Sequence, residues 1–557
     1  MTLTPRGQLA VSLSIVSAFG LGWYLALGGG QTINPTNVSW MLEGDWMGHL
    51  FGWLFTRNGP WALPLASAPD LVHPAGSSAA LTDAIPLAAV VAKLFSPLAP
   101  EAFQYFGLWM LLGTIGLGVA GVLVLRPHVK DPALLTLGGM LCVMNPIVST
   151  RYGHPPFYGF WALTGLVGLS LWPVAELKSA RRVAGAALVL GFLGCAMNAY
   201  LALMASGLMF AAVVRLALVE RRFSRREGAA WVAATPAVAV LSLWLFGFIS
   251  GARSSPVENL AIEGFGQFSA DPFTFVNPFT WSRFLPALPV APRQYEGYAY
   301  LGLGILALLA FRLALLARFR PSRDELKSLA PLLLVALVMA FYALSNQVIV
   351  GGRLVAHLDF YDRLAPLPSI FRSSGRFVWP LHVLLTLTAI LGAARLTRIW
   401  LARVVLGLAF LVQVIDFNVA TSTLGRPAPE FRPFRAPEWK LLGQDYRHLY
   451  IHPVQINWTC PFNPVLVAKL SWEAYRQRLT INSGHVGRAP PGTNCTRHLA
   501  PAELDPQTVY IPYFQEYYPD FATAGWVCGV LEGVPLCVSP ARETALKQLL
   551  QQRAFPR

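Results

Sequence analysis

The sequence has little charge, and acidic residues are especially few. Charged side chains make up 13% of the 557 residues, with 28 Asp and Glu against 43 Lys and Arg, whereas hydrophobic residues make up 55%. Soluble domains carry about 25% charged residues, so this composition excludes an ordinary soluble protein. Together with a mean hydropathy of +0.49, it indicates a polytopic membrane protein.

Motifs of several enzyme classes are also missing. The sequence has no Walker loop, no nucleophile elbow of the form Gly-x-Ser-x-Gly, and no Cys-x-x-Cys pair of a zinc site. ATP-driven chemistry and hydrolysis by a catalytic triad therefore find no support in the sequence.

Eleven apolar stretches predict membrane-spanning helices, each of which needs about 20 apolar residues. The predicted spans are 8–28, 103–125, 132–150, 157–175, 183–197, 199–217, 229–250, 298–316, 329–350, 377–394 and 399–416. The first stretch has no clear small-x-small cleavage site, so we expect it to remain as an anchor.

Basic residues gather in the short loops on one side of the predicted spans. They are Arg126 and Lys130, then Lys178, Arg181 and Arg182, the cluster 221–226, then Arg318, Arg320, Arg323 and Lys327, and finally Arg395 and Arg398. The positive-inside rule makes this side cytoplasmic, together with the N-terminus. Because the loops account for much of the net charge of +15, a nucleic-acid partner is not indicated.

Three loops, 29–102, 251–297 and 351–376, and the C-terminal tail are predicted on the outer side. The loop 29–102 follows the first span and is far longer than a connection needs. Two amphipathic stretches within it, Trp46–Phe55 and Ala84–Phe95, could lie in the plane of the membrane interface. After a membrane domain of residues 1–416, residues 417–437 form a proline-rich linker. Residues 438–557 are predicted to form a soluble α/β domain, which is large enough for a modest core.

The six cysteines divide into two groups. Cys142 and Cys195 lie in predicted spans. The other four follow the last span, on the predicted outer side: Cys460, Cys495, Cys528 and Cys537. In an oxidising compartment these four predict two disulfides, and three connectivities stay open. The alternative is free or partly paired thiols.

The first candidate site is the run Glu43-Gly44-Asp45-Trp46, shortly after the first span. A carboxylate at the membrane interface, shielded from bulk water, has a raised proton affinity and can act as a general base. Asp45 is the preferred residue for this role, with Glu43 beside it and Asp83 as the next candidate. The structural alternatives are an acid in a helix first turn for Asp45 and a helix N-cap for Asp83.

The second candidate site lies at the outer end of the tenth predicted span. Arg372 and Arg376 flank Ser373, Ser374 and Gly375 there. Two arginines separated by small residues can bind a phosphate from two sides, and the N-terminal amides of the span can add to the site. Snorkelling of the arginines to the interface is the alternative. It does not explain the Ser-Ser-Gly between them, so the pattern favours a phosphate site.

Two further outer runs combine aromatic and polar side chains, as sugar sites do. Arg151 and His154 belong to the run 151–158, and Tyr295 and Glu296 belong to the run 294–300. A generic aromatic belt at the membrane surface has the same composition, so both interpretations stay open. Glu296 is a candidate second acid.

Taken in order, these motifs resemble the GT-C superfamily of membrane glycosyltransferases, and more closely a bacterial group of GT-C-like proteins. That superfamily combines many spans, a long first outer loop with a catalytic Asp or Glu near its start, and often an outer C-terminal domain. The motifs, whose order is more specific than any one of them, are Gly44-Asp45, Gly52-Trp53-Leu54-Phe55, Arg57, Trp61, Pro64, Asp83-Ala84-Ile85-Pro86, Phe103-Gln104-Tyr105-Phe106-Gly107, Gln294-Tyr295-Glu296-Gly297 and Phe371-Arg372-Ser373-Ser374-Gly375-Arg376.

The resemblance implies a fold of about eleven transmembrane helices with a C-terminal periplasmic α/β domain, in the bacterial inner membrane. It also implies transfer of a sugar from a polyprenyl-phosphate-linked donor to a periplasmic glycan, lipid or protein. Asp45 would deprotonate the acceptor hydroxyl, and Arg372 and Arg376, with Ser373 and Ser374, would hold the departing lipid phosphate.

The resemblance also implies a set of substrate contacts. These are Arg57, Arg151, His154, Tyr295 and Glu296. Some members of the superfamily need a divalent metal such as Mg²⁺ or Mn²⁺ and others do not. The sequence shows no cluster of carboxylates dense enough to demand one.

Three other functions stay open. A secondary transporter or lipid flippase usually places ionisable or unwound segments near the membrane midplane, and the predicted spans hold almost none. A polysaccharide polymerase or ligase also uses outer arginines and polyprenyl-linked sugars, but often lacks a carboxylate base. A non-catalytic assembly protein would act through its tail.

Overall fold

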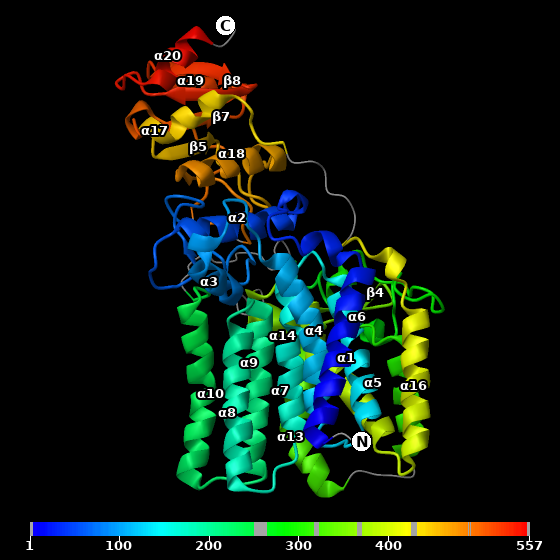
Figure 1. The fold of residues 1–557 in the computed structure, drawn as a ribbon. Helices are drawn as coiled ribbons and strands as arrows, with labels where there is room; N and C mark the ends of the chain where they lie inside the picture. The colour runs from blue at the N-terminus through cyan, green and yellow to red at the C-terminus, as the bar shows by residue number, and fades with distance from the viewer. Residues whose placement is uncertain are drawn as a thin grey trace. The chain divides into compact units, whose positions relative to one another are not determined.

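The described part of the chain is mainly helical, with one larger mixed sheet near the C-terminus (Figure 1). This computed structural model describes residues 4–249, 264–316, 322–364, 370–424, 432–487, 489–490 and 492–553. Parts of the predicted segments therefore lie outside the described residues, among them 251–263 of the predicted outer loop 251–297, the basic positions 318 and 320, and 425–431 of the linker.

The chain forms two compact units. The helical unit comprises Met1–Asn34, Phe106–Leu243 and Pro256–Arg426. The α/β unit comprises Pro35–Tyr105, Trp244–Ser255 and Pro427–Arg557. The first outer loop thus belongs to the same unit as the C-terminal domain, whereas the sequence grouped it with the membrane domain.

The helical unit consists of apolar helices that run side by side (Figure 1). They are α1 (Pro5–Ala26), α4 (Phe106–Leu125), α5 (Pro132–Val143), α6 (Pro146–Thr150), α7 (Trp161–Leu171), α8 (Leu177–Cys195), α9 (Ala199–Val214), α10 (Arg225–Leu245), α12 (Leu303–Leu316), α13 (Arg323–Ala343), α15 (Trp379–Ala394) and α16 (Ile399–Asp416). A hairpin of β3 (Gln347–Val350) and β4 (Arg353–His357), with the short helix α14 (Asp359–Arg363), follows α13.

Eight of the described helical segments are long and apolar enough to cross a membrane. They are Pro5–Ala26, Phe106–Leu125, Pro132–Thr150, Ala199–Val219, Arg225–Leu245, Arg323–Ala343, Ser374–Ala394 and Ile399–Asp416. Each overlaps a predicted span. The composition and these helices together indicate a membrane protein, and the orientation expected from the basic loops stays a prediction.

The other three predicted spans contain helices that are shorter or more charged. α7 has 11 residues and α12 has 14, whereas α8 carries Lys178, Arg181 and Arg182 near its start. The predicted span 132–150 is broken between α5 and α6, because Pro146 lacks a backbone N–H and the Asn145 side chain caps the second helix. A total of eleven spans therefore stays a prediction.

The α/β unit combines segments from both ends of the chain. From the first outer loop come α2 (Asp45–Asn58), β1 (Ser67–Ala68), β2 (Ser77–Ser78) and α3 (Pro86–Leu94). From the C-terminal part come α17 (Leu442–Asp445), β5 (His448–His452), α18 (Pro464–Gln477), β6 (Thr480–Ile481), β7 (Thr508–Pro512), α19 (Tyr518–Ala522), β8 (Val527–Leu531), β9 (Val534–Val538) and α20 (Ala545–Gln552). The predicted α/β character of the C-terminal domain is thereby confirmed.

The five-stranded sheet of this unit is mixed, with the order β6-β5-β7-β9-β8. β5 runs parallel to both β6 and β7, while β9 runs antiparallel to β7 and β8. Loops that leave the parallel strands at their carboxyl ends therefore gather at one edge of the sheet, which is the usual position of ligand sites in such sheets.

The first outer loop is joined to that sheet by backbone hydrogen bonds. The N–H of His73 donates to the carbonyl of Ile481, and the N–H of Ile481 donates to the carbonyl of Asp70, both over 2.8 Å. Every residue of α2 from Trp46 to Thr56 is buried. The expectation that Trp46–Phe55 lies in the membrane interface is therefore wrong, because its aromatic side chains are covered within the unit.

Two disulfides stabilise the C-terminal domain, as predicted from the four cysteines after the last predicted span. Cys460 is bonded to Cys495, and Cys528 is bonded to Cys537 across the β8–β9 hairpin. Cys142 and Cys195 are free and buried.

An apolar patch on the α/β unit is expected to contact lipid. Its exposed side chains come from α3 and the turns beside it: Trp61, Leu63, Val91, Leu94, Phe95 and Leu98. In reconstituted protein, we expect a nitroxide at Leu94→Cys to collide more with oxygen than with an aqueous nickel chelate. A nitroxide at Glu516→Cys, an exposed position of the same unit, should show the opposite preference. An equal ratio of oxygen collisions to nickel collisions at the two positions would contradict lipid contact at Leu94.

Candidate functional site

Asp45 is the first residue of α2, and its side chain is partly open to solvent. Gly44 before it has a φ of +54°, a conformation that favours glycine. The Asp45 side chain is 43% exposed, and its Oδ1 lies 3.5 Å from Nε2 of His485. The position in a helix first turn, which was the structural alternative, is thus observed. It also stabilises a carboxylate, because the N-terminus of a helix carries partial positive charge.

His485 reaches Asp45 from the loop that follows β6. Its side chain is only 14% exposed. A Cβ on Gly48 would lie 2.7 Å from His485 Nδ1 and 2.9 Å from its carbonyl oxygen, so only glycine at position 48 leaves room for the ring. Burial lowers the pKa of His485 to about 4, although the neighbouring Asp45 carboxylate acts in the opposite direction. The imidazole is therefore neutral at neutral pH.

The sequence did not reveal His485. It stands in the polar run Asn482-Ser483-Gly484-His485 after a strand of two residues. So short a strand shows no alternation, which leaves no pattern to predict a sheet edge there. The one available signal was a histidine beside a glycine in a polar turn.

The two other acidic candidates near Asp45 differ in their surroundings. Glu43 is exposed. Asp83 is half-buried and has a φ of +51°, and the residue that caps α3 is Ile85, so the predicted alternative of Asp83 as an N-cap is wrong. Beside it, His49 Nδ1 donates to the carbonyl of Thr82 over 2.9 Å, which ties this segment to α2.

Arg57 holds the end of α2 to the turn that follows α3. Its Nε donates to Ser96 Oγ over 2.7 Å, and its two terminal nitrogens donate to four backbone carbonyls and to the Tyr475 hydroxyl. These contacts engage the whole guanidinium fork within the α/β unit. We therefore assign Arg57 a structural role and not the substrate contact expected from the sequence.

A buried ion cluster lies in the helical unit, and it joins three of the predicted residues. Glu296 Oε2 accepts from Arg151 Nη1 over 2.9 Å and from Arg376 Nη2 over 2.8 Å. Arg151 Nη2 also donates to the carbonyls of Tyr295 and Glu296, over 2.7 and 2.8 Å. The close approach depends on Gly297 and Gly375, since a Cβ on Gly375 would lie 2.7 Å from the Gly297 Cα.

Aromatic rings cover the Arg376 side of this cluster. The guanidinium carbon lies 4.8 Å from the ring centre of Phe157 and 4.6 Å from that of Tyr200. Burial alone would raise the pKa of Glu296, but the two guanidiniums hold it well below its ordinary range. A buried carboxylate held in its ionised form by two arginines is a poor base or acid, so we assign Glu296 a structural role.

Most residues of the predicted phosphate site, 372–376, are buried or hydrogen-bonded within the protein. Arg372 is exposed, whereas Ser373, Ser374 and Arg376 are buried. The Ser373 N–H donates to the Tyr200 hydroxyl over 3.1 Å, and the Gly375 N–H donates to a carbonyl at residue 268 over 2.9 Å. Arg372 is therefore the residue of this loop that solvent reaches most readily.

His154 and Tyr295, the other predicted sugar contacts, lie near the same cluster. His154 is half-buried, packs edge-on against Phe157, and adds a favourable charge interaction with Glu296. Tyr295 is 51% exposed and meets Phe268 edge-on. Tyr295 thus offers an aromatic surface to solvent beside the buried ions.

One group of possible metal ligands exists among the described residues, although the sequence showed none. His357, Asp359 and Asp362 are exposed, and one ligand atom from each lies within 4.8 Å of the others. His357 Nδ1 is 2.7 Å from Asp359 Oδ1, and the Asn346 amide donates to Asp362 over 2.9 Å. These contacts account for the cluster, and we assign no metal to it.

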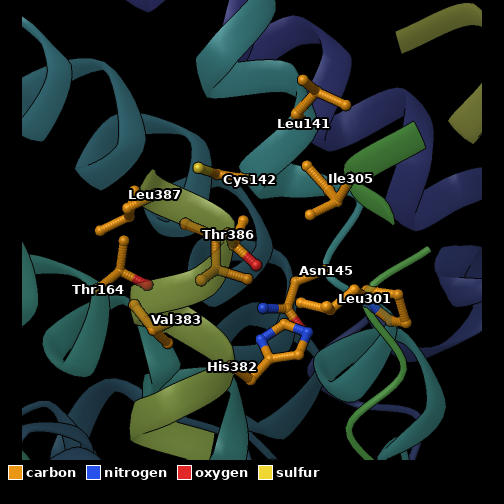
Figure 2. Close-up of a pocket in the computed structure, with 12 residues that line it drawn as sticks. Leu141, Cys142, Asn145, Thr164, Leu301, Ile305, His382, Val383, Thr386 and Leu387 are labelled. Carbon is orange, nitrogen blue, oxygen red and sulfur yellow. The ribbon is translucent and has the colours of Figure 1, made fainter. Parts of the chain in front are cut away.

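A small cavity lies inside the helical unit, next to the break between α5 and α6 (Figure 2). His382, Thr386, Asn145 and Cys142 line it together with apolar side chains. It leaves about 10 Å³ for the centre of a water molecule, which is room for about one water. His382 Nδ1 and Thr386 Oγ1 have no hydrogen-bond partner in the described chain. The cavity is too small for a sugar or a lipid phosphate.

This chain belongs to the DUF6311 family. The family's model, described as "Domain of unknown function (DUF6311)", matches residues 17–418, which is more than half of the chain. A second model, described as "DUF6311 C-terminal domain", matches residues 438–539. No curated protein matches the chain. The two matched stretches leave a gap at the position of the predicted linker.

Proposed function

We propose that this protein is a membrane glycosyltransferase. It would move a sugar from a polyprenyl-phosphate-linked donor to a hydroxyl of a glycan, lipid or protein on the outer side of the membrane. The observation that carries the proposal is Asp45, a partly exposed carboxylate at the start of the buried helix α2, with a neutral histidine beside it. A general base for a hydroxyl nucleophile must lie within reach of substrate, and a partly exposed carboxylate can fill this role.

The proposed reaction is a substitution at the anomeric carbon of the donor. Asp45 takes the proton of the acceptor hydroxyl as its oxygen bonds to that carbon. The bond from the anomeric carbon to the phosphate oxygen breaks, and polyprenyl phosphate leaves with the electron pair. The developing phosphate charge is stabilised by cationic donors, and the sequence resemblance assigns this role to Arg372.

The roles of the remaining predicted residues follow from their contacts. Arg376, Arg151 and Glu296 form the ion cluster that holds residues 294–297 against residues 374–378. They would act by positioning Arg372 and Tyr295. Because Asp45 and Arg372 belong to different units, separate variants test the two roles.

The first experiment identifies the donor. Purified protein in lipid nanodiscs is incubated with a panel of labelled polyprenyl-phosphate sugars and a cell-envelope extract as acceptor, with and without Mg²⁺ or Mn²⁺. Release of polyprenyl phosphate and transfer of label from one donor class are expected. Absence of turnover with every donor would make a transporter or an assembly protein the better interpretation.

Arg372→Ala should lower kcat/KM for the donor by about 10- to 100-fold, because a charged donor to the phosphate is lost. Arg372→Lys should retain part of the activity, since it keeps the charge but not the planar fork. Arg363→Ala removes another exposed arginine of the same unit and is the matched control. Equal kcat/KM for Arg372→Ala and Arg363→Ala would remove Arg372 from the site.

A further inference from the structure

We propose that His485 is a positioning residue for Asp45, so that the C-terminal domain completes the base. The imidazole Nε2–H would donate to Asp45 Oδ1 and leave Oδ2 to face the acceptor hydroxyl. This inference rests on the proposed function, because it assigns His485 to the same reaction. Asp45 and His485 both belong to the α/β unit.

The direction of the His485 ring is the first argument. Nε2 is the nitrogen nearest Asp45, at 3.5 Å from Oδ1. Nδ1 lies on the side of Gly48, where even a methyl group would collide with it. A neutral imidazole carries one N–H. The ring also has a hydrogen bond with its own backbone. The proposal places the single N–H of the neutral ring on Nε2, where it faces the carboxylate.

The rigidity of the His485 loop is the second argument. Before His485, the Asn482 side chain exchanges two hydrogen bonds with the backbone of Ile451, each of 2.9 Å. After it, the Val486 N–H donates to Asn457 Oδ1 over 2.6 Å, and the Gly487 N–H donates to a carbonyl of the first outer loop over 2.7 Å. A side chain held from both sides can fix the geometry of a base.

The surroundings of His485 favour its neutral form. Among the described residues, the titratable groups that face it are Asp45 and His49, both on α2. Phe462 packs edge-on against the ring, with 6.0 Å between the ring centres. Burial lowers the pKa of His485 to about 4, and His49 acts in the same direction. The imidazole therefore stays a neutral donor across the working range of most enzymes.

The location at the carboxyl edge of the sheet is the third argument. The loops after β5 and β6 supply Asn457 and His485, and ligand sites of α/β sheets lie where parallel strands end. Asp45 is brought to this edge by α2. A residue of the first outer loop and a residue of the tail thus share one site, which explains why the loop folds with the C-terminal domain.

The test compares His485→Ala and His485→Gln in donor turnover. In His485→Ala, which has lost the hydrogen-bond donor to Asp45, kcat should fall by about 10- to 100-fold while KM changes little. The acid limb of the pH–rate profile should move to higher pH in His485→Ala, because a hydrogen bond to the ionised carboxylate is lost. His485→Gln can still donate and should recover most of kcat. His498→Gln, which changes another histidine of the same domain away from Asp45, is the control.

Three results would overturn the role of His485. They are a wild-type kcat and pH profile in His485→Ala, equal losses in the Ala and Gln variants with an unchanged pH profile, or an unaltered His485 signal in Asp45→Asn. The last is read from the imidazole ¹⁵N spectrum of histidine-labelled protein, assigned with His485→Ala, and needs no activity. An active Asp45→Asn would instead show that Asp45 is not the base and would overturn the proposed mechanism. Failure of the His485 role and failure of the proposed function can therefore be told apart.

Discussion

Asp45→Asn will lower kcat for sugar transfer by about 10²- to 10⁴-fold and leave KM for the donor nearly unchanged. Asparagine has the size of aspartate but cannot take a proton from the acceptor hydroxyl. Loss of a first-turn acid from a helix costs about 0.3–1 kcal/mol, so the variant should fold. Steady-state release of polyprenyl phosphate by the purified proteins measures the effect.

Glu43→Gln is the matched control for this prediction. It removes the same charge two positions away. Glu43 is exposed and precedes α2, so we assign it no catalytic role, and the variant should retain the wild-type kcat. Equal kcat values for Asp45→Asn and the wild type would remove Asp45 as the base. Asp83, which is half-buried and strained at a φ of +51°, would then be the next residue to change. An arginine-driven polymerase or ligase would show the same insensitivity.

Glu296→Gln will destabilise the helical unit by about 3–5 kcal/mol, because it leaves two buried guanidiniums without their counter-charge. Glu296 accepts from both Arg151 and Arg376 at 2.9 Å or less. Unfolding by sodium dodecyl sulfate in mixed micelles measures the change. Tyr295→Phe, at the neighbouring exposed position, should change the free energy of unfolding little. An unchanged midpoint for Glu296→Gln would show that the cluster is not needed for stability.

The pH dependence of this stability has a definite sign. Arg151 and Arg376 overcome the effect of burial and hold the Glu296 pKa well below its ordinary value of 4.5. The unfolded chain therefore takes up the proton at higher pH than the folded chain does. The contribution of Glu296 is complete above pH 4.5 and is lost as the pH falls toward the folded pKa. Wild-type stability should fall more steeply below pH 4.5 than that of Glu296→Gln.

Much of the helical unit could be predicted from the sequence, because apolar length is a strong signal. Eight predicted spans correspond to helices long enough to cross a membrane. The break at Asn145-Pro146 was missed, since both halves are apolar and their summed length imitates one span. The two disulfides followed from four cysteines after the last predicted span, but the pairing of Cys528 with Cys537 depends on the sheet register, which places the two residues opposite each other.

The α/β unit could be predicted only in part. The aromatic residues of α2 fit an interfacial helix as well as a buried one, and periodicity does not tell the two apart. Both the first outer loop itself, through residues such as Tyr105, and the C-terminal domain, through Tyr475, bury α2, and the residues of that domain lie at the far end of the chain. The same separation concealed His485, because a contact between distant segments leaves no local pattern.

The arginines show the limit of motif reasoning most clearly. Arg372 and Arg376 look equivalent in the sequence, yet one is exposed and the other is buried against Glu296. Arg57 looks like a substrate contact until its guanidinium is found bonded to the turn after α3. In each case the role of the arginine depends on the residue that its guanidinium contacts, and that residue belongs to another segment of the chain.

Single-turnover transfer from a doubly labelled donor tests the central claim most directly. The protein is mixed in excess over a polyprenyl-phosphate sugar that carries one label in the lipid and another in the sugar, and both products are followed over time. The proposed function predicts that polyprenyl phosphate and glycosylated acceptor appear at one rate and in equal amounts, and that Asp45→Asn slows both together. Intact donor at the end of the reaction, or equal rates in wild type and Asp45→Asn, would contradict a transferase that uses Asp45 as its base.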